Sequence, residues 1–497
     1  MTDNVKNFMK TFEAKIEGAE IYLVGGAVRD MFMGREVNDY DFTTNITVDD
    51  MEKHFKCVDI GQSKDFGITS IQYGGESYEV ATYRKDVGSS DGRHPDAVDF
   101  NATLKEDLAR RDFTMNAMAM DVDGNVEDPF LGNLDRMNGI IRAVGVADKR
   151  IEEDALRILR AVRFAVTYGF AIEDDLNFAI IKNRESINNL SQERITQEII
   201  KVASIGGQTF YRYFKLLEEL DLVSIIFPEI EVMKDFRQYW LHHPEGGLMC
   251  PVDNPDVIVP LTIKGMESGL YNLVECGSVY AHVKSVLSMV PEEADEFVVL
   301  SALWHDIGKP ITAEWKDDNT GTCSFKRHEY KGVEVFEEMA KKRKLGGILS
   351  RCIAFSVAQH MNMNNKELSK KSTILNMALN PFFDTLAEVS RADDKSRNVN
   401  GNVLYVEEEF DKNLNKFLDA RENFVDTTAL KAKIGEFVNG KKVMDICDIK
   451  PSKKVGAIIE EVTEFLIEED FNVSVEEIDK MIKWLGERME VEDAKGD

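Results

Sequence analysis

The sequence predicts an α+β fold, in which a small mixed β-sheet with helices is followed by segments built from helices alone. Three observations predict it. Residues 59–87 alternate apolar and polar side chains between glycines, which is typical of short strands joined by turns. Residues 151–170 and 190–202 instead place apolar side chains at helical spacing. The stretch after residue 400 is amphipathic and charge-dense, which also indicates helices.

Length and composition limit the class of protein. With 497 residues the chain is long enough for three or four domains, each with its own core. It is 43% hydrophobic, has no apolar run near the ~20 residues that a membrane span needs, and begins with a polar stretch that lacks the apolar core of a signal peptide. We therefore expect a cytoplasmic protein without membrane contact. The six cysteines contain no Cys-x-x-Cys pair and are expected to be reduced.

The charge balance argues against one class of function. A net charge of −28 excludes a general nucleic-acid coat, because nonspecific affinity for phosphate backbones comes from lysine and arginine. Basic residues nevertheless gather between residues 142 and 163, and such a local track is compatible with holding one RNA end. The opposite interpretation, that these side chains only balance neighbouring acids such as Glu152 and Glu153, stays open.

The strongest motif lies in residues 23–44, LVGGAVRDMFMGREVNDYDFTT. Gly25 and Gly26 have no Cβ, so the backbone can turn sharply there and bring N–H groups close to phosphate oxygens. Asp39 and Asp41 stand two apart in a β-prone stretch, which predicts that both carboxylates leave one face roughly 6.5 Å apart. Such a pair can bracket two Mg²⁺ ions and clamp both oxygens of a phosphoryl displacement. Each element alone occurs by chance, but together they predict nucleotidyl transfer.

This stretch closely resembles the signature of the class II nucleotidyltransferases, which comprise the bacterial-type CCA-adding tRNA nucleotidyltransferases and poly(A) polymerases. The resemblance implies a head at residues 1–140, a helical neck at 141–240, a metal-binding helical domain at 241–400 and a helical, tRNA-binding tail at 401–497. The family's YEVxTxR motif matches residues 78–84 and implies that Glu79 is a third metal carboxylate. The alternative for Glu79 is a solvent-facing strand residue.

A second matching string, RRDFTMNAMA, covers residues 110–119. Guanidinium groups beside an active site can fork onto triphosphate oxygens, which lysine cannot do. The resemblance implies that the nucleotide is bound by Arg111, Asp112 and Asn116, together with Arg29 from the first motif. For Asp112 the alternative is a structural ion pair, with Arg29 or Arg110 as the expected partner.

Residues 153–157 match the family's EDxxR motif. Asp154 and Arg157 are three apart and are expected to be neighbours on one helix face, where an ordinary surface ion pair is the alternative. The resemblance implies that they read the incoming base. A carboxylate accepts from the exocyclic amine of cytosine or adenine, while uracil and guanine present a carbonyl there. Arg160 and Arg163 on the same helix are expected to support nucleotide binding, and the SxERIxxE string implies that Glu193 and Arg194 buttress this helix.

The resemblance implies the partners and leaves sibling activities open. The substrates are the 3′ end of tRNA, CTP and ATP, with Mg²⁺ at the head, and nothing indicates an obligatory protein partner. The stretch after the aspartate pair lacks the arginine-rich GRRF-like motif of the family's poly(A) polymerases, which favours CCA addition. An enzyme that adds only A would share every catalytic residue, so that alternative stays open.

Six of the eight histidines lie between residues 241 and 400. WHDIGKP, residues 304–310, resembles the HD phosphohydrolase motif, in which histidines and aspartates hold a divalent metal. The resemblance implies a site for a divalent transition metal that activates water toward phosphate esters. Its expected first ligands are His282, His305, Asp306 and Asp393, and a second metal is expected at His328 and His360. His282 departs from the usual pattern, because a long interval separates it from HHPEG and no threonine follows it. A phosphohydrolase with a disused head is the remaining alternative.

Overall fold

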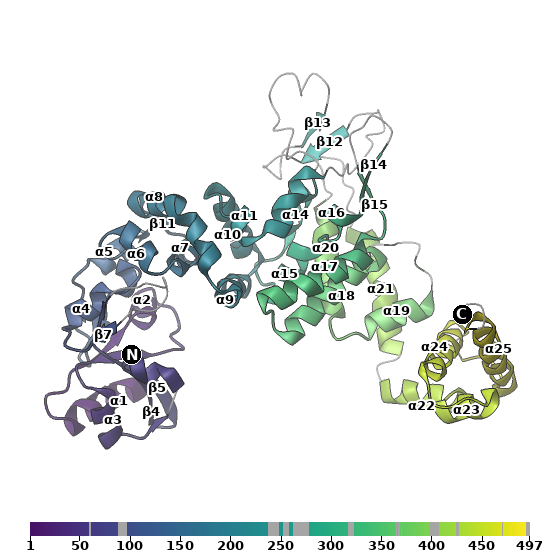
Figure 1. Cartoon of the computed structure of the whole chain (residues 1–497), viewed down its shortest axis with the longest axis horizontal. Coiled ribbons are helices and arrows are strands. Elements are labelled where there is room, and N and C mark those ends of the chain that lie inside the picture. Colours follow the sequence, from purple (N-terminus) through teal and green to yellow (C-terminus); the bar gives the residue numbers. More distant parts are fainter. Residues whose placement is uncertain are drawn as a thin grey trace. The chain divides into compact units, whose positions relative to one another are not determined.

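The computed structural model describes residues 1–58, 61–87, 97–236, 248–251, 258–261, 278–316, 323–363, 365, 368, 370–396, 407–423, 427–469 and 471–493. The chain forms two compact units (Figure 1). Unit 1 comprises residues 1–231, 291–296 and 341–345, and unit 2 comprises residues 232–290, 297–340 and 346–497. The four narrower segments expected from the sequence stay predictions.

Unit 1 begins with a sheet whose described strands run in the order β3-β4-β5-β2-β1-β8-β9. The bounds are Ile21–Val24 for β1, Asp41–Thr44 for β2, Cys57–Val58 for β3, Ile68–Tyr73 for β4, Glu76–Thr82 for β5, Ala119–Met120 for β8 and Val126–Glu127 for β9. β2 and β5 run parallel, while the other neighbouring strands run antiparallel. The prediction of a mixed sheet in an α+β fold is therefore confirmed.

An aromatic core fills one face of this sheet. Helix α1 (Asp3–Lys15) places Phe8 against Phe42 of β2 and Tyr78 of β5, with ring centroids 5.1 and 4.7 Å apart. Val80 is buried on the same face, whereas Glu79 between them lies on the opposite face. In Figure 1, α1 and α3 (Val48–His54) lie beside β4 and β5. The aromatic core thus covers one face of the sheet, and the opposite face is available for a functional site.

Short elements connect the sheet to the helices that follow. They are α2 (Gly26–Phe32), η1 (Gly61–Phe66), β6 (Lys85–Val87), β7 (Ala97–Asp99), α4 (Leu104–Ala109), η2 (Thr114–Asn116), α5 (Gly132–Met137) and β10 (Ile140–Ile141). Gly132 packs against η2 so closely that a Cβ would lie 2.0 Å from the Thr114 carbonyl oxygen. Only glycine allows this approach, and it holds the turn of the RRDFT segment in place.

The remaining elements of unit 1 are mainly helices. They are α6 (Ala147–Glu153), α7 (Leu156–Tyr168), β11 (Ala171–Ile172), α8 (Asp174–Asn183), η3 (Arg184–Asn189), α9 (Gln192–Ala203), α10 (Gly207–Glu219), α11 (Val223–Ile226) and α12 (Pro228–Glu231). The apolar stripe expected along residues 155–166 is buried, as predicted.

The helix expected around Asp154 is interrupted, which corrects the prediction that Asp154 and Arg157 are neighbours on one helix face. Asp154 follows α6 in an extended conformation, with φ −154° and ψ 105°. Its Oδ1 accepts a hydrogen bond from the Leu156 N–H group at 3.0 Å. A short acidic side chain that caps the next helix in this way competes with the continuous helical ladder, which explains the break.

Unit 2 contains the second set of helices. They are η4 (Val232–Asp235), α14 (Val279–Met289), α15 (Glu296–Trp304), α16 (Lys309–Thr312), α17 (His328–Arg343), α18 (Gly347–Met363), α19 (Lys371–Ala378), α20 (Phe383–Lys395), α21 (Glu407–Asn423), α22 (Thr427–Phe437), α23 (Gly440–Cys447), α24 (Lys453–Glu468) and α25 (Val475–Asp493), with the ends of α15 and α17 belonging to unit 1. Two hairpins interrupt them, β12 (Leu248–Pro251) with β13 (Ile258–Leu261) and β14 (Ala313–Trp315) with β15 (Cys323–Phe325). The expectation that this part is purely helical was therefore incomplete.

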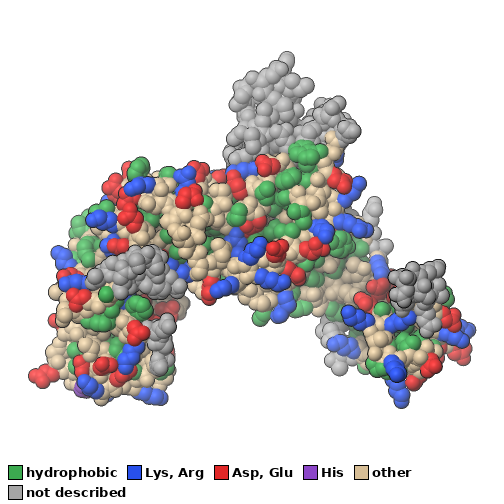
Figure 2. All heavy atoms as spheres, in the orientation of Figure 1, with side chains coloured by type: hydrophobic (Ala, Val, Ile, Leu, Met, Phe, Trp, Pro, Cys, Tyr) green, Lys and Arg blue, Asp and Glu red, His purple; other side chains and the backbone are tan. Residues whose placement is uncertain are grey.

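Acidic and basic side chains are intermixed on the face shown in Figure 2, so the acidic excess forms no single patch in that view. Among the described residues, no helix has the length and apolar character to cross a membrane. The thiols of Cys323 and Cys352 are buried, and those of Cys57 and Cys447 are half-buried.

Candidate functional sites

Three predicted carboxylates line one cleft in unit 1. The parallel register of β2 and β5 places Asp41 directly beside Glu79. Asp39 precedes β2, so the prediction that both aspartates stand on one strand was wrong in that detail. All three residues nevertheless line one cleft of about 760 Å³. The sequence correctly identified these residues as neighbours, although they lie up to forty positions apart in the chain.

The electrostatics of the cleft suit a divalent cation. Burial raises the pKa of Asp41, an effect that Arg111 opposes and Asp39 strengthens. Burial also raises the pKa of Glu79, and the charges of Asp41 and Asp39 add to that shift. Carboxylates that repel one another in this way are the oxygen donors that Mg²⁺ prefers. The residues present therefore fit the expected cation.

The glycine turn lies against Arg111. Gly25 has φ +71°, a conformation that favours glycine, and a Cβ there would lie 3.0 Å from Nη1 of Arg111. Burial lowers the pKa of Arg111, which keeps its charge because arginine titrates far above neutral pH. Its Nη2 is 3.7 Å from the Asp107 carboxylate, and its Nε has no hydrogen-bond partner among the described residues. A guanidinium held this way beside an open backbone turn is suited to an anion.

Behind this turn, polar side chains form a continuous hydrogen-bonded chain. Arg29 donates through Nη1 to Asn116 Oδ1 at 2.6 Å, and Asn116 donates through Nδ2 to Asp112 Oδ1 at 3.0 Å. Arg160 then donates through Nε to Asp112 Oδ2 at 2.8 Å. The partner of Asp112 is thus Arg160, whereas the alternative expected from the sequence named Arg29 or Arg110. Arg110 instead pairs with Asp107 at 2.9 Å.

This network predicts a stability effect that depends on pH. Burial alone would raise the pKa of Asp112, but Arg160, Asn116 and the Phe113 amide lower it to about 2. A lowered carboxyl pKa contributes stability above the unfolded value near 4, and that contribution is lost as pH falls through about 2. Asp112→Asn is expected to lower the unfolding free energy of unit 1 by roughly 2 kcal/mol at pH 7, with a smaller difference below pH 4. Thermal melts at several pH values measure this difference in unfolding free energy, and the exposed Asp123→Asn serves as the control. An equal loss of stability in both variants would contradict the assignment of Asp112 to this network.

The predicted base-reading residues have separate partners. Asp154 Oδ2 accepts a hydrogen bond from Nη2 of Arg194 at 2.8 Å, as the buttressing role expected for Arg194 requires. Arg157 donates to Glu153 Oε2 and to the Arg150 carbonyl, both at 2.7 Å. Asp154 and Arg157 are therefore each held from behind by another side chain rather than by one another.

Glu193 and Arg163 form ion pairs with other residues. Glu193 pairs with Lys344 at 3.2 Å and does not contact the base-reading pair. Arg163 donates to the buried Glu198 at 2.7 Å and lies 4.3 Å above the Phe164 ring. The pairing of Arg157 with Glu153 agrees with the interpretation that the basic residues of this region balance neighbouring acids, whereas Glu198 was not expected as the partner of Arg163.

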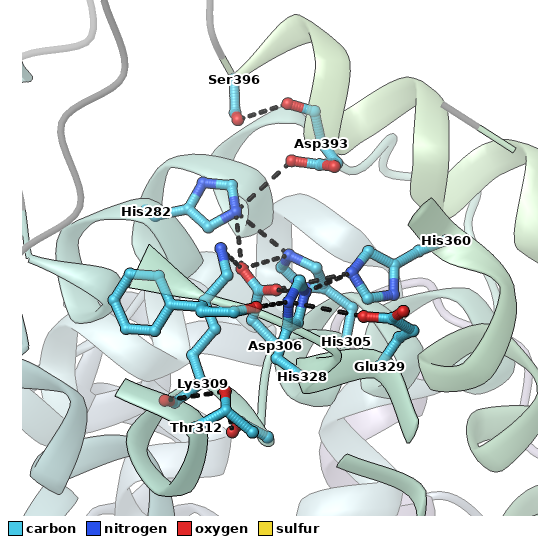
Figure 3. Close-up of polar contacts among 12 residues, drawn as sticks. His282, His305, Asp306, Lys309, Thr312, His328, Glu329, His360, Asp393 and Ser396 are labelled. Carbon is cyan, nitrogen blue, oxygen red and sulfur yellow. Dashed lines mark hydrogen bonds and ion pairs between the residues drawn. The ribbon is translucent and has the colours of Figure 1, made fainter. Parts of the chain in front are cut away.

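A buried cluster in unit 2 unites all the residues predicted to hold a metal in the histidine region (Figure 3). They are His282 on α14, His305 and Asp306 directly after α15, His328 at the start of α17, His360 on α18 and Asp393 on α20. Two groups have ligand atoms within 4.8 Å of one another, and they share Asp306. His282, whose assignment departed from the motif, is a full member of the first group.

Asp306 is the centre of this cluster. Its Oδ2 lies 3.0 Å from His282 Nε2 and 3.1 Å from His305 Nε2. Its Oδ1 lies 3.2 Å from His328 Nε2 and 3.5 Å from His360 Nε2. One carboxylate thus faces two pairs of imidazoles, as a ligand shared between two positions would.

Backbone carbonyls orient three of these imidazoles. His305, His328 and His360 place Nδ1 2.8 Å from the carbonyl oxygens of residues 302, 325 and 357. A carbonyl only accepts, so each Nδ1 carries a proton and each ring turns its Nε2 toward the centre. This arrangement is how proteins prepare histidine as a metal ligand.

The charges of the cluster centre on Asp306. Burial lowers the pKa of His282 to about 4, so this ring is neutral at pH 7. Burial would raise the pKa of Asp306, but His305 and Lys309 hold it well below its usual range. Lys309 places Nζ 2.6 Å from Asp306 Oδ2, so a cation already lies against the carboxylate. Lys309 was not predicted from the sequence to take part in this cluster, although Lys309 lies three residues after Asp306.

Models of known domains match the chain in three places. Residues 21–142 match the poly A polymerase head domain, and residues 169–234 match the probable RNA and SrmB-binding site of polymerase A. Residues 276–396 match the HD domain. The predicted head carboxylates and the histidine cluster thus lie within recognised domains.

Curated relatives match part of the chain. The CCA-adding enzyme of Geobacillus stearothermophilus is 43% identical over 247 residues, which are 48% of this chain and 60% of that protein. The CCA-adding enzyme of Lactobacillus helveticus (strain DPC 4571) is 46% identical over 186 residues, which are 37% of this chain and 46% of that protein. The chain therefore spans about half the length of the curated relatives it matches.

Among solved structures, the Bacillus stearothermophilus CCA-adding enzyme in complex with CTP covers all of both chains, with a TM-score of 0.61 and 22% sequence identity. A second CCA-adding enzyme, in its apo form II, covers 97% of this chain with a TM-score of 0.56 and 18% identity. At these identities the likeness concerns the fold. The chain thus combines a segment that matches the poly A polymerase head domain with one that matches the HD domain, and it is similar to CCA-adding enzymes in sequence and in fold.

Proposed function

We propose that this protein is a template-independent RNA nucleotidyltransferase that completes the 3′ CCA end of tRNA from CTP and ATP and releases pyrophosphate. The observation that carries the proposal is the register of β2 and β5, which sets Asp41 beside Glu79 in a cleft that Asp39 also lines. The identity of 43–46% to named CCA-adding enzymes, over 186 to 247 residues of this chain, supports the same conclusion.

The proposed chemistry is attack of the terminal RNA hydroxyl on the α-phosphorus of the nucleotide. Asp39, Asp41 and Glu79 would hold Mg²⁺, which lowers the pKa of the attacking hydroxyl and stabilises the departing pyrophosphate when bound. Gly25 and Gly26 offer backbone N–H groups to the triphosphate, and Arg111 supplies the positive charge beside them. The bond between the RNA oxygen and the α-phosphorus forms as the bond to pyrophosphate breaks, and the proton of the attacking hydroxyl passes to solvent water.

The network behind the turn has a proposed supporting role. Arg29, Asn116, Asp112 and Arg160 bond to one another, so they hold the nucleotide side of the cleft rather than present open groups to a ligand. Arg163 is likewise engaged by Glu198. We assign these residues to positioning Arg111 and the neck helix α7, which is a narrower role than direct nucleotide binding.

Base selection is proposed to rest on Asp154 and Arg157. Asp154→Ala is expected to remove the acceptor for the exocyclic amine of C and A, and the preference for CTP over UTP should fall at least roughly tenfold. Single-nucleotide incorporation with each NTP measures the ratio of kcat/KM values. Arg194→Ala is expected to weaken the same preference while leaving Asp154 in place. A preference unchanged in both variants would contradict the assignment.

The test of the whole proposal is incubation with tRNA that lacks its last three nucleotides. We expect incorporation of CTP first and of ATP only after two C residues are present. Use of ATP but not CTP would identify an A-adding enzyme, and long A tracts would identify a poly(A) polymerase. No elongation with any nucleotide would overturn the proposal.

The buried cluster around Asp306 supports a second function. We propose that it holds a divalent transition metal and hydrolyses phosphate esters, with 2′,3′-cyclic nucleotides as test substrates. Imidazole and carboxylate ligands suit such metals, and the four Nε2 atoms converge on one carboxylate. The intact head residues argue against a chain whose only activity is hydrolysis.

A further inference from the structure

The cleft that contains the carboxylates reaches beyond them over β4 and β5. Ser70 of β4 and Ser77 of β5 belong to its lining. Gly25 and Arg111, which we assign to the triphosphate, do not. β2 has β1 on one side and β5 on the other, so the carboxylates have two distinct flanks. The triphosphate occupies the β1 flank under the proposed function, which leaves the β5 flank for the other reactant.

The hydroxyl groups of Ser70 and Ser77 form a pair on this second flank. The register of β4 and β5 sets Ser70 directly opposite Glu79, and Ser77 precedes Glu79 by two residues on the same face. The two Oγ atoms lie 2.6 Å apart. One O–H group donates within the pair, so the second O–H group and lone pairs on both oxygens can bind a ligand hydroxyl.

The floor beneath this pair is rigid. Ser70 and Ser77 lie within six consecutive paired positions of β4 and β5. Tyr78 and Val80 anchor the opposite face of β5 in the core, at 5% and 0% exposure. Polar groups on a fixed strand pair bind a ligand without first having to be ordered, which favours specific recognition.

The charge of the lining indicates which chemical group fits. Four carboxylates line the cleft, from Asp39, Asp41, Glu76 and Glu79, and none of the lining residues that the structure describes is lysine or arginine. Phosphate groups are therefore repelled from its far part, whereas a neutral sugar with hydroxyl groups is not. The terminal ribose of an RNA chain is such a group, and its 2′-hydroxyl is what lets a protein tell RNA from DNA.

We propose that Ser70 and Ser77 bind the 2′-hydroxyl of the terminal ribose of the RNA acceptor. The inference rests on the proposed function, because that function requires the 3′-hydroxyl of the same ribose to lie at the carboxylates. The adjacent 2′-hydroxyl then reaches the serine pair beside Glu79. The pair thus makes the cleft select an RNA end over a DNA end.

Two acceptors test this inference, an RNA minihelix ending in ribose and the same minihelix ending in 2′-deoxyribose, both with a 3′-hydroxyl. The unmodified protein is expected to use the ribose end roughly tenfold better in kcat/KM for CMP incorporation. In Ser70→Ala/Ser77→Ala the preference should fall to within about twofold, with an unchanged KM for CTP. Ser77→Ala alone, at an exposed position, should show an intermediate preference.

Gln72→Ala is the matched control, because Gln72 is exposed on β4 opposite Ser77 and does not line the cleft. It should keep the full preference. An unchanged preference in the serine variants, no preference in the unmodified protein, or an equal loss with both acceptors would overturn the inference. If neither acceptor is elongated by the unmodified protein, it is the proposed function that fails.

Discussion

Asp41→Asn is expected to lower CMP incorporation into trimmed tRNA by roughly 10³-fold, because the amide loses the charge that holds the divalent cation beside Glu79. The effect should appear in kcat at saturating CTP, since Arg111 and the glycine turn that hold the triphosphate are unchanged. Radiolabelled CMP incorporation at several Mg²⁺ concentrations measures it. Asp39→Asn/Asp41→Asn should be little worse than the single variant, because the residues of one metal site act as a unit.

The same substitution is expected to leave the fold intact. Burial raises the pKa of Asp41, so the folded state holds its proton more tightly than the unfolded chain does. A raised carboxyl pKa means that the charge destabilises the fold at neutral pH, and this cost shrinks as pH falls through the folded value. Asp41→Asn should therefore melt at or slightly above the parental temperature. Asp65→Asn, an exposed change on η1, serves as the activity control. If folded Asp41→Asn kept the parental activity, the assignment of Asp41 as a catalytic residue would be wrong.

The parts of the site that could be predicted are those written in local sequence. The glycine turn and the Asp39–Asp41 pair were predicted from local sequence, whereas Glu79 and the six candidate ligands of the histidine region came from the resemblance to known motifs. The strand register that pairs Asp41 with Glu79 agrees with the alternation of apolar and polar residues along β5. For these residues, chemistry and pattern pointed to the same answer.

The parts of the site that could not be predicted depend on which segments, far apart in the chain, pack against one another. The pairing of Asp112 with Arg160 spans 48 positions and requires α7 to pack behind η2, which no local pattern reports. The break at Asp154 arises because one short side chain captures the Leu156 N–H group, while the apolar stripe around it stays helical in period. The β14–β15 hairpin lies between helices in a region whose histidines dominate the pattern, so its strands were missed.

Asp306→Ala is expected to abolish metal-dependent hydrolysis of 2′,3′-cyclic nucleotides, because Asp306 lies against all four imidazoles of the cluster. In the unmodified protein, a metal such as Mn²⁺ or Ni²⁺ at 100 times its Kd should stabilise unit 2 by about 2.7 kcal/mol, which corresponds to a rise in Tm of roughly 5–10 °C. The variant should show no such rise. Nucleotide addition should persist, because Asp306 and Asp41 belong to different units.

The variant is also expected to be less stable without metal, and this effect can be separated from metal binding. Removing Asp306 leaves the Lys309 ammonium, 12% exposed, without its carboxylate at 2.6 Å, and losing one partner of a buried pair costs roughly 3–5 kcal/mol. Asp306→Ala/Lys309→Met removes both charges and should recover most of that loss, yet it should still not respond to metal.

The pKa of Asp306 lies well below its usual range, so its stabilising contribution is complete at neutral pH and is lost only in strong acid. Differential scanning calorimetry of the three proteins, with and without metal, distinguishes these outcomes. A metal-induced rise in Tm that survives in the double variant would show that the metal binds elsewhere.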